Sequence, residues 1–303
     1  MGRIRQVETD KLVTLDGNTV VGRAAHCGIV LRDSRVSNEH AGLRWRSQGW
    51  SVRDLGSTNG TWLNGQHIPA GADQPLAVAD EVAFGAKEVL WRFEDNGAPE
   101  PMLCPIAGGP PCLLVDGVIA IPNAEAAVAS IFRGAEGGWT LEWDNRVRPI
   151  HAGEVFEMMG ETWRFSYPNQ WEATSRTRPL RLVQESTLLF DVSSDQEHVT
   201  LTVKYDDEMI AMGHLSAYYF LLQLARVRNQ ERQALPASES GWVHRETLMD
   251  MLRCGEQQLN VWVHRIRSRF SSKEFLDYAS IIERRDGTGQ MRIGVERSLI
   301  APA

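Results

Sequence analysis

The sequence predicts a multidomain protein in which an antiparallel β-sandwich and a second β-rich unit precede an α+β winged helix-turn-helix. Three observations lead to this fold class. Residues 11–94 contain many short strand patterns at close spacing and no helical period. A second group of strand patterns follows a segment rich in proline and glycine. After residue 214 the apolar residues recur at helical spacing, and a hairpin pattern follows them.

The composition is that of a globular protein with a sizeable core. The 303 residues are 43% hydrophobic and include ten tryptophans, which excludes a disordered chain. A chain of this length predicts two or three domains. The formal net charge of −7 argues against polyanion binding over the whole surface, but it is compatible with one local basic face.

The cysteines and the absence of long apolar runs predict the cellular compartment. The four cysteines form neither a CxxC pair nor a cysteine–histidine metal spacing, so we expect no metal and no cofactor. Without a disulfide framework, a reducing cytoplasm is the expected compartment. The N-terminus lacks the apolar segment of a signal peptide. No apolar run approaches the roughly 20 residues of a membrane helix, so we expect no membrane partner.

The first unit is predicted as a series of short strands joined by tight turns. The Asp16-Gly17-Asn18 turn and the Asn64-Gly65 turn are typical of hairpins, because their residues accept a positive φ. The predicted strands cover residues 12–15, 19–22, 29–31, 41–45, 50–55, 61–63, 66–69, 82–84 and 89–93.

Two polar clusters interrupt these strands. Residues 37–40 read SNEH and residues 56–60 read GSTNG, and each cluster falls in a predicted loop. A sheet can bring such loops together at one edge. Hydroxyl, amide and backbone N–H groups suit a small oxyanion, so the sequence predicts an anion-recognition site here.

Four motifs in this region resemble the forkhead-associated (FHA) domain. They are Gly22-Arg23, Ser37-x-x-His40, the run from Gly56 to Thr61, and Asn64-Gly65. The resemblance covers about residues 10–95, and we predict a domain at 1–97. It implies binding of phosphothreonine peptides, with phosphate contacts from Arg23, Ser37 and Thr58, backbone contacts from Asn38 and Asn59, and structural roles for Gly22, His40 and Gly60.

The chemistry of these side chains agrees with the resemblance. Phosphothreonine carries a charge of about −1.5 to −2 and three strong acceptor oxygens. An arginine fork with hydroxyl and amide donors is the matching set, and an asparagine can both donate to and accept from a peptide backbone. Arg35 lies two residues before Ser37, so we expect it to contact the ligand further along and to favour acidic residues C-terminal to the phosphothreonine.

Residues 98–112 are predicted as a linker and residues 113–165 as a second β-domain. The expected strands are 130–132, 139–143, 155–158 and 163–165. "GWTLEW" resembles "GWSVRDL", which predicts a degenerate copy of the first sandwich. The copy lacks the Gly-Arg, SxxH and Asn-Gly motifs, so its expected role is spacing, packing or protein contact. Alternatively, these strands extend the first domain or form an unrelated β-unit.

Residues 166–180 are predicted as a second linker, and residues 181–303 as the winged helix-turn-helix. Strands are expected at 188–192, 199–205 and 208–212, then three helices, the second at 245–252 and ended by Gly255, and a hairpin at 281–295. "LSAYYFLLQLA", "VHRETLMDML" and "LNVWVHRIRSRF" resemble the DNA-binding effector domain of two-component response regulators, over about residues 181–297. This resemblance implies that the third helix enters the major groove.

The third helix has two distinct faces. Its expected core stripe is Leu259, Trp262, Val263, Ile266 and Phe270. The opposite face and the hairpin supply the candidate contacts to double-stranded DNA: Val261, His264, Arg265, Arg267, Ser268, Arg269, Arg284 and Arg285. Between Gln257 and Ser272 there are three arginines and no acids. Glu283 and Asp286 dilute the charge of the hairpin, which predicts that DNA affinity depends on a homodimer or a second site.

Together these patterns predict a cytoplasmic transcriptional regulator. It would bind a protein phosphorylated on threonine by a Ser/Thr kinase and respond by changing its occupancy of DNA. The alternative is a phospho-dependent scaffold whose winged helix binds protein. An enzyme is not expected, because no catalytic constellation, metal spacing or phosphate-loop motif is present.

Overall fold

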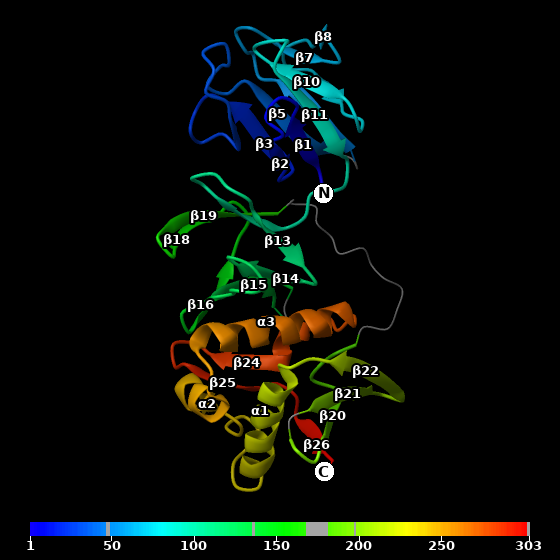
Figure 1. Ribbon diagram of the computed structural model, residues 1–303, viewed down its shortest axis with the longest axis vertical. Helices are drawn as coiled ribbons and strands as arrows, with labels where there is room; N and C mark the ends of the chain where they lie inside the picture. Colours follow the sequence, from blue (N-terminus) through cyan, green and yellow to red (C-terminus); the bar gives the residue numbers. More distant parts are fainter. Residues whose placement is uncertain (47–48, 135–136, 168–180, 197, 302–303) are drawn as a thin grey trace. The chain divides into compact units, whose positions relative to one another are not determined.

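The structure, a computed structural model, describes residues 1–46, 49–134, 137–167, 181–196 and 198–301 (Figure 1). These residues form two compact units. The first contains Met1–Leu113 and the described residues from Ala152 to 167, and the second contains Leu114–His151 and the described residues from 181 onward. The division differs from the predicted one, because the second β-region contributes strands to both units.

The N-terminal part of the first unit has two sheets whose strands pair mostly antiparallel, as predicted. One sheet has the order β2-β1-β11-β10-β7-β8. Its strands are β1 (Arg3–Gln6), β2 (Leu12–Thr14), β7 (Thr61–Leu63), β8 (Gln66–His67), β10 (Glu81–Phe84) and β11 (Leu90–Asp95). The other has the order β4-β3-β5-β6-β9. Its strands are β3 (Asn18–Gly22), β4 (Ile29–Val30), β5 (Ala41–Arg46), β6 (Gly49–Asp54) and β9 (Asp73–Pro75).

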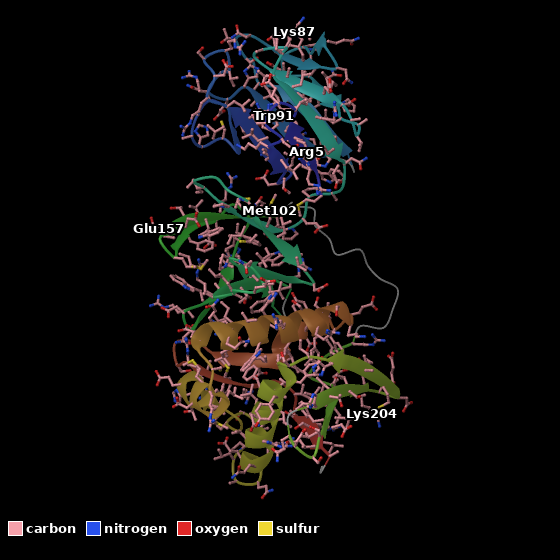
Figure 2. All side chains as sticks on the ribbon, in the orientation of Figure 1. Arg5, Lys87, Trp91, Met102, Glu157 and Lys204 are labelled. Atoms are coloured by element: carbon pink, nitrogen blue, oxygen red, sulfur yellow. The ribbon has the colours of Figure 1, made fainter. Side chains whose placement is uncertain are left out.

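Apolar residues from both sheets form one core. Leu43 and Val52 contribute from the second sheet, and Ile4, Trp91 and Phe93 contribute from the first. Trp91, labelled in Figure 2, is 1% exposed. The indole N–H of Trp50 donates to the carbonyl of Gly97 at 2.9 Å, which fastens the end of the sandwich. Side chains therefore fill the interior between the two sheets, and the candidate site lies in the loops outside this core.

The first unit also contains strands that the sequence analysis did not predict. β12 (Met102–Pro105) lies inside residues 98–112, which were predicted as a linker, and the first half of β13 (Cys112–Val115) pairs with it. β12 also pairs with β19 (Glu161–Ser166), and β19 pairs with β18 (Val155–Met158). Met102 and Leu103 are fully buried, so a strand forms although prolines flank it. The predicted linker at 166–180 lies almost entirely outside the described residues.

In the second unit, β13 continues into a meander of consecutive antiparallel strands. They are β14 (Val118–Ile121), β15 (Ala129–Arg133), β16 (Trp139–Trp143) and β17 (Arg146–Ile150). The order β13-β12-β19-β18 repeats that of β2-β1-β11-β10, and β14-β15-β16 repeats β3-β5-β6. The interpretation of a degenerate second copy stays a prediction.

The described residues in the C-terminal region of the second unit form two small sheets and three α-helices, which are labelled in Figure 1. The sheet β22-β21-β20-β26 consists of β20 (Thr187–Val192), β21 (Val199–Tyr205), β22 (Glu208–His214) and β26 (Arg297–Ile300). The helices are α1 (Tyr218–Glu231), α2 (Arg245–Leu252) and α3 (Glu256–Ser272), followed by the 3-10 turn η1 (Tyr278–Ile281). The sheet β23-β25-β24 consists of β23 (Val243–His244), β24 (Ile282–Arg285) and β25 (Gln290–Ile293).

The helices follow the predicted periodicity. Leu259, Val263, Ile266 and Phe270 of α3 are buried in the core of this unit, and Trp262 packs against it. The prediction for the end of α2 was wrong, because Arg253 adopts a left-handed φ of 51° there and Gly255 instead precedes α3. In the part of the chain that the structure describes, no helix has the length and apolar character needed to cross a membrane.

Candidate functional site

The first candidate site begins where β3 ends. A Cβ at Gly22 would lie 2.1 Å from the backbone oxygen of Asn38, so only glycine permits this close approach of two loops. The approach places Arg23 beside Ser37, with the Arg23 N–H donating to the Ser37 carbonyl at 2.9 Å. Arg23 is exposed, and its Nε donates to the Val36 carbonyl at 3.3 Å. Among the described residues, no acidic group pairs with the Arg23 guanidinium.

His40 joins the two polar loops from inside the sandwich. Its side chain is fully buried. The Ser37 N–H donates to His40 Nδ1 at 3.1 Å, which leaves the ring proton on Nε2. Nε2 then donates to the Gly60 carbonyl at 2.8 Å. The His40 ring thus links the backbone of the two polar loops.

Asp54 organises the second polar loop, and the sequence analysis missed it. The carboxylate accepts hydrogen bonds from the N–H groups of Gly56 and Ser57 at 2.8 and 2.9 Å. It also accepts from the hydroxyls of Ser57 and Thr61, both at 2.6 Å. Burial alone would raise its pKa, but these hydrogen bonds together lower the pKa below its ordinary value. An aspartate two residues before a turn glycine is the signal that could have identified it.

Ser37 and Thr58 meet across the two loops. The Thr58 N–H donates to Ser37 Oγ at 3.1 Å, and the two hydroxyl oxygens are 3.5 Å apart. Asn38, next in the chain, is exposed. Asn59 donates its amide N–H to the Arg35 carbonyl at 2.8 Å, so part of its hydrogen-bonding capacity holds the loops together. The candidate phosphate contacts predicted from separate stretches are thus gathered on adjoining loops.

Arg35 is exposed but already engaged. Its guanidinium contacts Asp33 at 2.8 Å, and Glu88 lies 3.9 Å away. The hydrogen bonds from Arg35 lower the pKa of Asp33 to about 2, so this carboxylate is ionised. The predicted preference of Arg35 for acidic ligand residues must therefore compete with Asp33 of its own loop and with Glu88 of the β10–β11 loop.

The combined chemistry of these loops suits a phosphate monoester. Two neighbouring hydroxyls and an arginine are donors, and a phosphate offers three acceptor oxygens. The acidic side chains near the site already have partners. Asp33 and Glu88 lie close to the Arg35 guanidinium. Asp54 is hydrogen-bonded within its own loop, and Glu39 pairs with His26 at 2.7 Å. The donors of these loops therefore suit an anionic ligand.

The second candidate site is the face of α3 predicted to contact DNA. Arg265 is exposed, and Ser268, Arg269 and Arg285 are half-buried. Val261, His264 and Arg267 are 4%, 6% and 2% exposed, and the side chain of Arg284 is 9% exposed. Half of the predicted DNA contacts are therefore not accessible to DNA in this arrangement, because strands β14–β16 of the same unit cover them.

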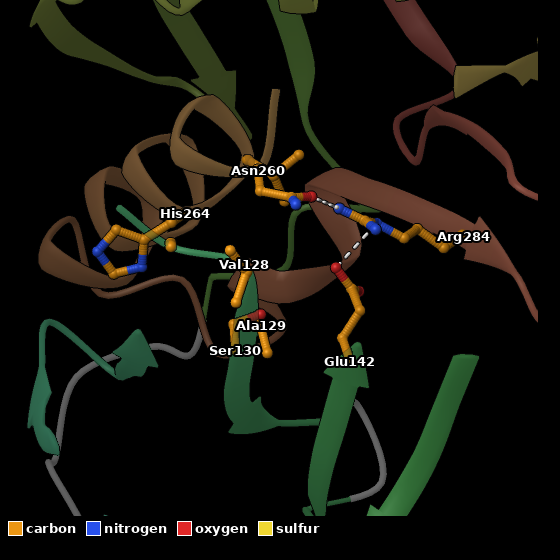
Figure 3. Close-up of a pocket in the computed structure, with 9 residues that line it drawn as sticks. Val128, Ala129, Ser130, Glu142, Asn260, His264 and Arg284 are labelled. Atoms are coloured by element: carbon orange, nitrogen blue, oxygen red, sulfur yellow. Dashed lines mark hydrogen bonds and ion pairs between the residues drawn. The ribbon is translucent and has the colours of Figure 1, made fainter. Parts of the chain in front are cut away.

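Glu142 of β16 contacts one of these buried arginines, Arg284 (Figure 3). Glu142 lies 3.0 Å from the Arg267 guanidinium and 2.8 Å from that of Arg284, and Arg284 also donates to Asn260 at 3.1 Å. Burial alone would raise the pKa of Glu142, but the two arginines together lower it. Burial, with Arg267 and Arg265 nearby, lowers the pKa of His264 to about 4, so this ring is neutral at pH 7.

Comparison with known proteins matches the first candidate site. Residues 19–85 match the FHA domain family, so this region is an FHA domain, as predicted. FhaB, an FHA domain-containing protein of Mycobacterium tuberculosis, is 35% identical over 82 residues, which are 27% of this chain and 53% of FhaB. The glycogen accumulation regulator GarA of the same organism is 33% identical over 85 residues, 26% of this chain and 51% of GarA. The chain thus spans about half the length of these relatives.

Solved structures with a similar region include one complex with a protein domain and one with a phosphopeptide. The FhaA FHA domain, in complex with an intracellular domain, is 25% identical with a TM-score of 0.28, covering 31% of this chain and all of that one. EmbR of Mycobacterium tuberculosis, in complex with a low-affinity phosphopeptide, is 20% identical with a TM-score of 0.29, covering 33% of this chain and 25% of EmbR.

Proposed function

We propose that this protein binds phosphothreonine peptides through the loops around Ser37 and Thr58 and binds DNA through its C-terminal region. The observation that carries the first half is the convergence of Arg23, Ser37 and Thr58 on adjoining loops, with the Arg23 guanidinium exposed. The FHA match over residues 19–85 supports the same ligand. The phosphothreonine would be made by a Ser/Thr kinase on a partner protein.

A peptide selection tests this ligand. The full chain is offered phosphothreonine, phosphoserine and unphosphorylated peptide libraries that are otherwise identical. We expect selective retention of phosphothreonine peptides, because Arg23, Ser37 and Thr58 supply donors for the phosphate and the FHA match favours phosphothreonine as the phosphorylated residue. Arg23→Ala should lose this retention, since it removes the charged phosphate contact. Arg46→Ala is the matched control, because Arg46 is exposed at the opposite end of β5. Equal retention by both variants would overturn the site assignment.

The DNA-binding half rests on the C-terminal region. Three helices followed by the β24–β25 hairpin have the order of a winged helix-turn-helix. The exposed Arg265 and the partly exposed Arg269 lie on α3, whose residues between Gln257 and Ser272 include no acid. Such a surface is suited to phosphates and to guanine edges. Salt-sensitive binding of the full chain to DNA duplexes with a randomised core tests it.

A scaffold function is the second candidate. The specific observation that favours it is that α3 already contacts protein, the β14–β16 sheet of its own unit, through residues predicted to contact DNA. In a scaffold this contact would be permanent, and α3 would never be available to DNA. Absence of DNA binding by the full chain at low salt, and by variants that free α3, would favour the scaffold.

A further inference from the structure

The β14–β16 sheet presents one complete face to α3. Strand pairing aligns Ala120 with Ser130 and Ser130 with Glu142, and it aligns Val118 with Phe132, so these five residues share a face. Val118 and Phe132 belong to the same apolar core as α3. Ala120 and Ala127 form a small buried cluster with Val261 of α3. Residues 114–151, which contain this sheet, are called the cover below.

The cover also neutralises the charge of the predicted DNA-contacting surface. Glu142 is 4% exposed and pairs with both Arg267 and Arg284. The guanidinium of Arg267 in addition stacks over the Phe132 ring, 4.3 Å from its centroid. The carboxylate thus occupies the position that a DNA phosphate would take between a helix arginine and a hairpin arginine.

The hairpin is held at its tip as well. The N–H of Val147 donates to Asp286 Oδ1 at 2.9 Å, and the N–H of Gly287 donates to the Asn145 carbonyl at 2.9 Å. Arg245, at the start of α2, donates to the side chain of Asn145 at 2.7 Å. The cover therefore contacts the helix and the hairpin together, which are the two elements that a winged helix applies to DNA.

The contact leaves polar atoms of α3 unsatisfied. His264 Nδ1, Arg267 Nη1 and Ser268 Oγ are buried without a hydrogen-bond partner among the described residues. A cavity of about 10 Å³ lies beside His264, Glu142 and Arg284 (Figure 3). A buried donor or acceptor without a partner costs free energy, so these atoms weaken the contact between α3 and the cover. All three side chains belong to the set predicted to contact DNA, and DNA offers partners for each of them.

We propose that the cover masks the DNA-binding surface of α3 and the β24–β25 hairpin, and that the protein binds DNA through this surface only when the cover detaches. This proposal rests on the DNA-binding function proposed above. The same side chains cannot contact Glu142 and a DNA phosphate at once, so the cover and DNA compete for one surface. The apparent affinity of the full chain for DNA is the affinity of the uncovered form multiplied by the fraction of molecules that are uncovered.

A disulfide between the cover and the hairpin tests the proposal in the full chain. Val147 and Asp286 are in direct contact, and neither is a proposed DNA contact. The Val147→Cys/Asp286→Cys variant is titrated with a pool of duplexes that have a randomised core, before and after reduction, with each single cysteine variant as a control. We expect the oxidised form to bind DNA at least about tenfold more weakly than the reduced form, since locking removes the uncovered population.

A charge reversal tests the same competition in the opposite direction. Glu142→Lys places a third positive charge against Arg267 and Arg284, so we expect the cover to detach and DNA affinity to rise by about tenfold. Glu125→Lys is the matched control, because Glu125 is an exposed acid of the cover and the change in net charge is identical. Circular dichroism establishes that both variants are folded.

The outcomes separate the two proposals. Weaker binding by the oxidised form together with tighter binding by Glu142→Lys than by Glu125→Lys supports masking. Equal DNA affinity of the oxidised and reduced forms overturns masking while the DNA-binding function stands. Absence of DNA binding by every form, including the reduced double-cysteine variant and Glu142→Lys, overturns the DNA-binding function and masking with it.

Discussion

The strands β3-β5-β6 and β14-β15-β16 are connected in the same order but are buried differently. In β6 the buried residues alternate with more exposed ones, whereas all four residues of β14 are buried. Alternation is typical of a sheet with one face in solvent, and continuous burial is typical of a sheet covered on both faces. The first sheet therefore keeps one face in solvent, while the second packs its outer face against α3.

The largest expected effect on stability comes from removing the carboxylate that pairs with the two buried arginines. Glu142→Ala leaves Arg267 and Arg284 buried without their counterion, so the second unit should lose about 3 kcal/mol or more of its unfolding free energy. Urea unfolding of the full chain measures this. Glu157→Ala is the control, because Glu157 is exposed on β18 (Figure 2) and its removal should change stability by less than about 0.5 kcal/mol. Equal effects of the two changes would show that the ion pairs do not hold the cover.

The corresponding change in the first unit is Asp54→Ala. It leaves the N–H groups of Gly56 and Ser57 and two hydroxyls without their acceptor, which should cost about 2 kcal/mol of stability. The loop that carries Thr58 should also become less ordered, so phosphopeptide affinity should fall by about tenfold. Calorimetry with the selected peptide measures the affinity. Unchanged affinity would mean that Thr58 does not depend on this loop.

The two units should also differ in their response to pH through His264. Its pKa is about 4 in the folded protein against an ordinary 6.5, so the unfolded chain binds a proton between these values and the folded chain does not. Stability of the second unit is thus fully retained above pH 6.5 and falls as the pH drops toward 4. The loss at pH 5 should be about 2 kcal/mol.

The neighbours of His264 shape this response. Arg265 and Arg267 oppose its protonation and Asp116 favours it, while Glu142 and Arg284 line the same cavity. The two arginines lower the pKa of Glu142, although burial alone would raise it. His264→Gln should flatten the pH dependence of urea unfolding between pH 7 and 5. A slope unchanged by the substitution would assign the dependence to another group.

The smallest expected effect concerns ligand selection by Arg35. Asp33→Asn removes the nearer of the two acids that engage Arg35, so affinity for phosphothreonine peptides with acidic C-terminal residues should rise by about threefold. Affinity for peptides with neutral residues there should not change, which is the internal control. Equal changes for both peptides would remove Arg35 from the set of ligand contacts.

The first site was largely predictable from the sequence because its geometry is local. Turn residues such as Asn64-Gly65 and the close approach at Gly22 have strong sequence signatures, and Ser37, His40 and Thr58 lie within one stretch. Asp54 was not predicted as a site residue, because it is the last residue of a strand and polar residues are common at strand ends. The match of residues 19–85 to the FHA family confirms the fold and family of this region.

The covered face was not predictable in the same way. Helical periodicity identified the core stripe of α3, but it cannot show which partner buries the opposite face. Glu142 and Arg267 are 125 positions apart, so no short-range pattern connects them. The one available signal was the apolar run of residues 118–121, which is typical of a strand buried on both faces. β12 was missed because prolines flank its apolar residues.

The most direct test of the central claim is a calorimetric titration of the full chain with one selected phosphothreonine peptide and with the same peptide lacking the phosphate. Because the phosphate supplies the charge that Arg23 and the two hydroxyls bind, the phosphorylated peptide should bind on the order of a hundredfold more tightly. Equal affinities for the two peptides would contradict the account, since the loops around Ser37 and Thr58 would then not bind phosphate.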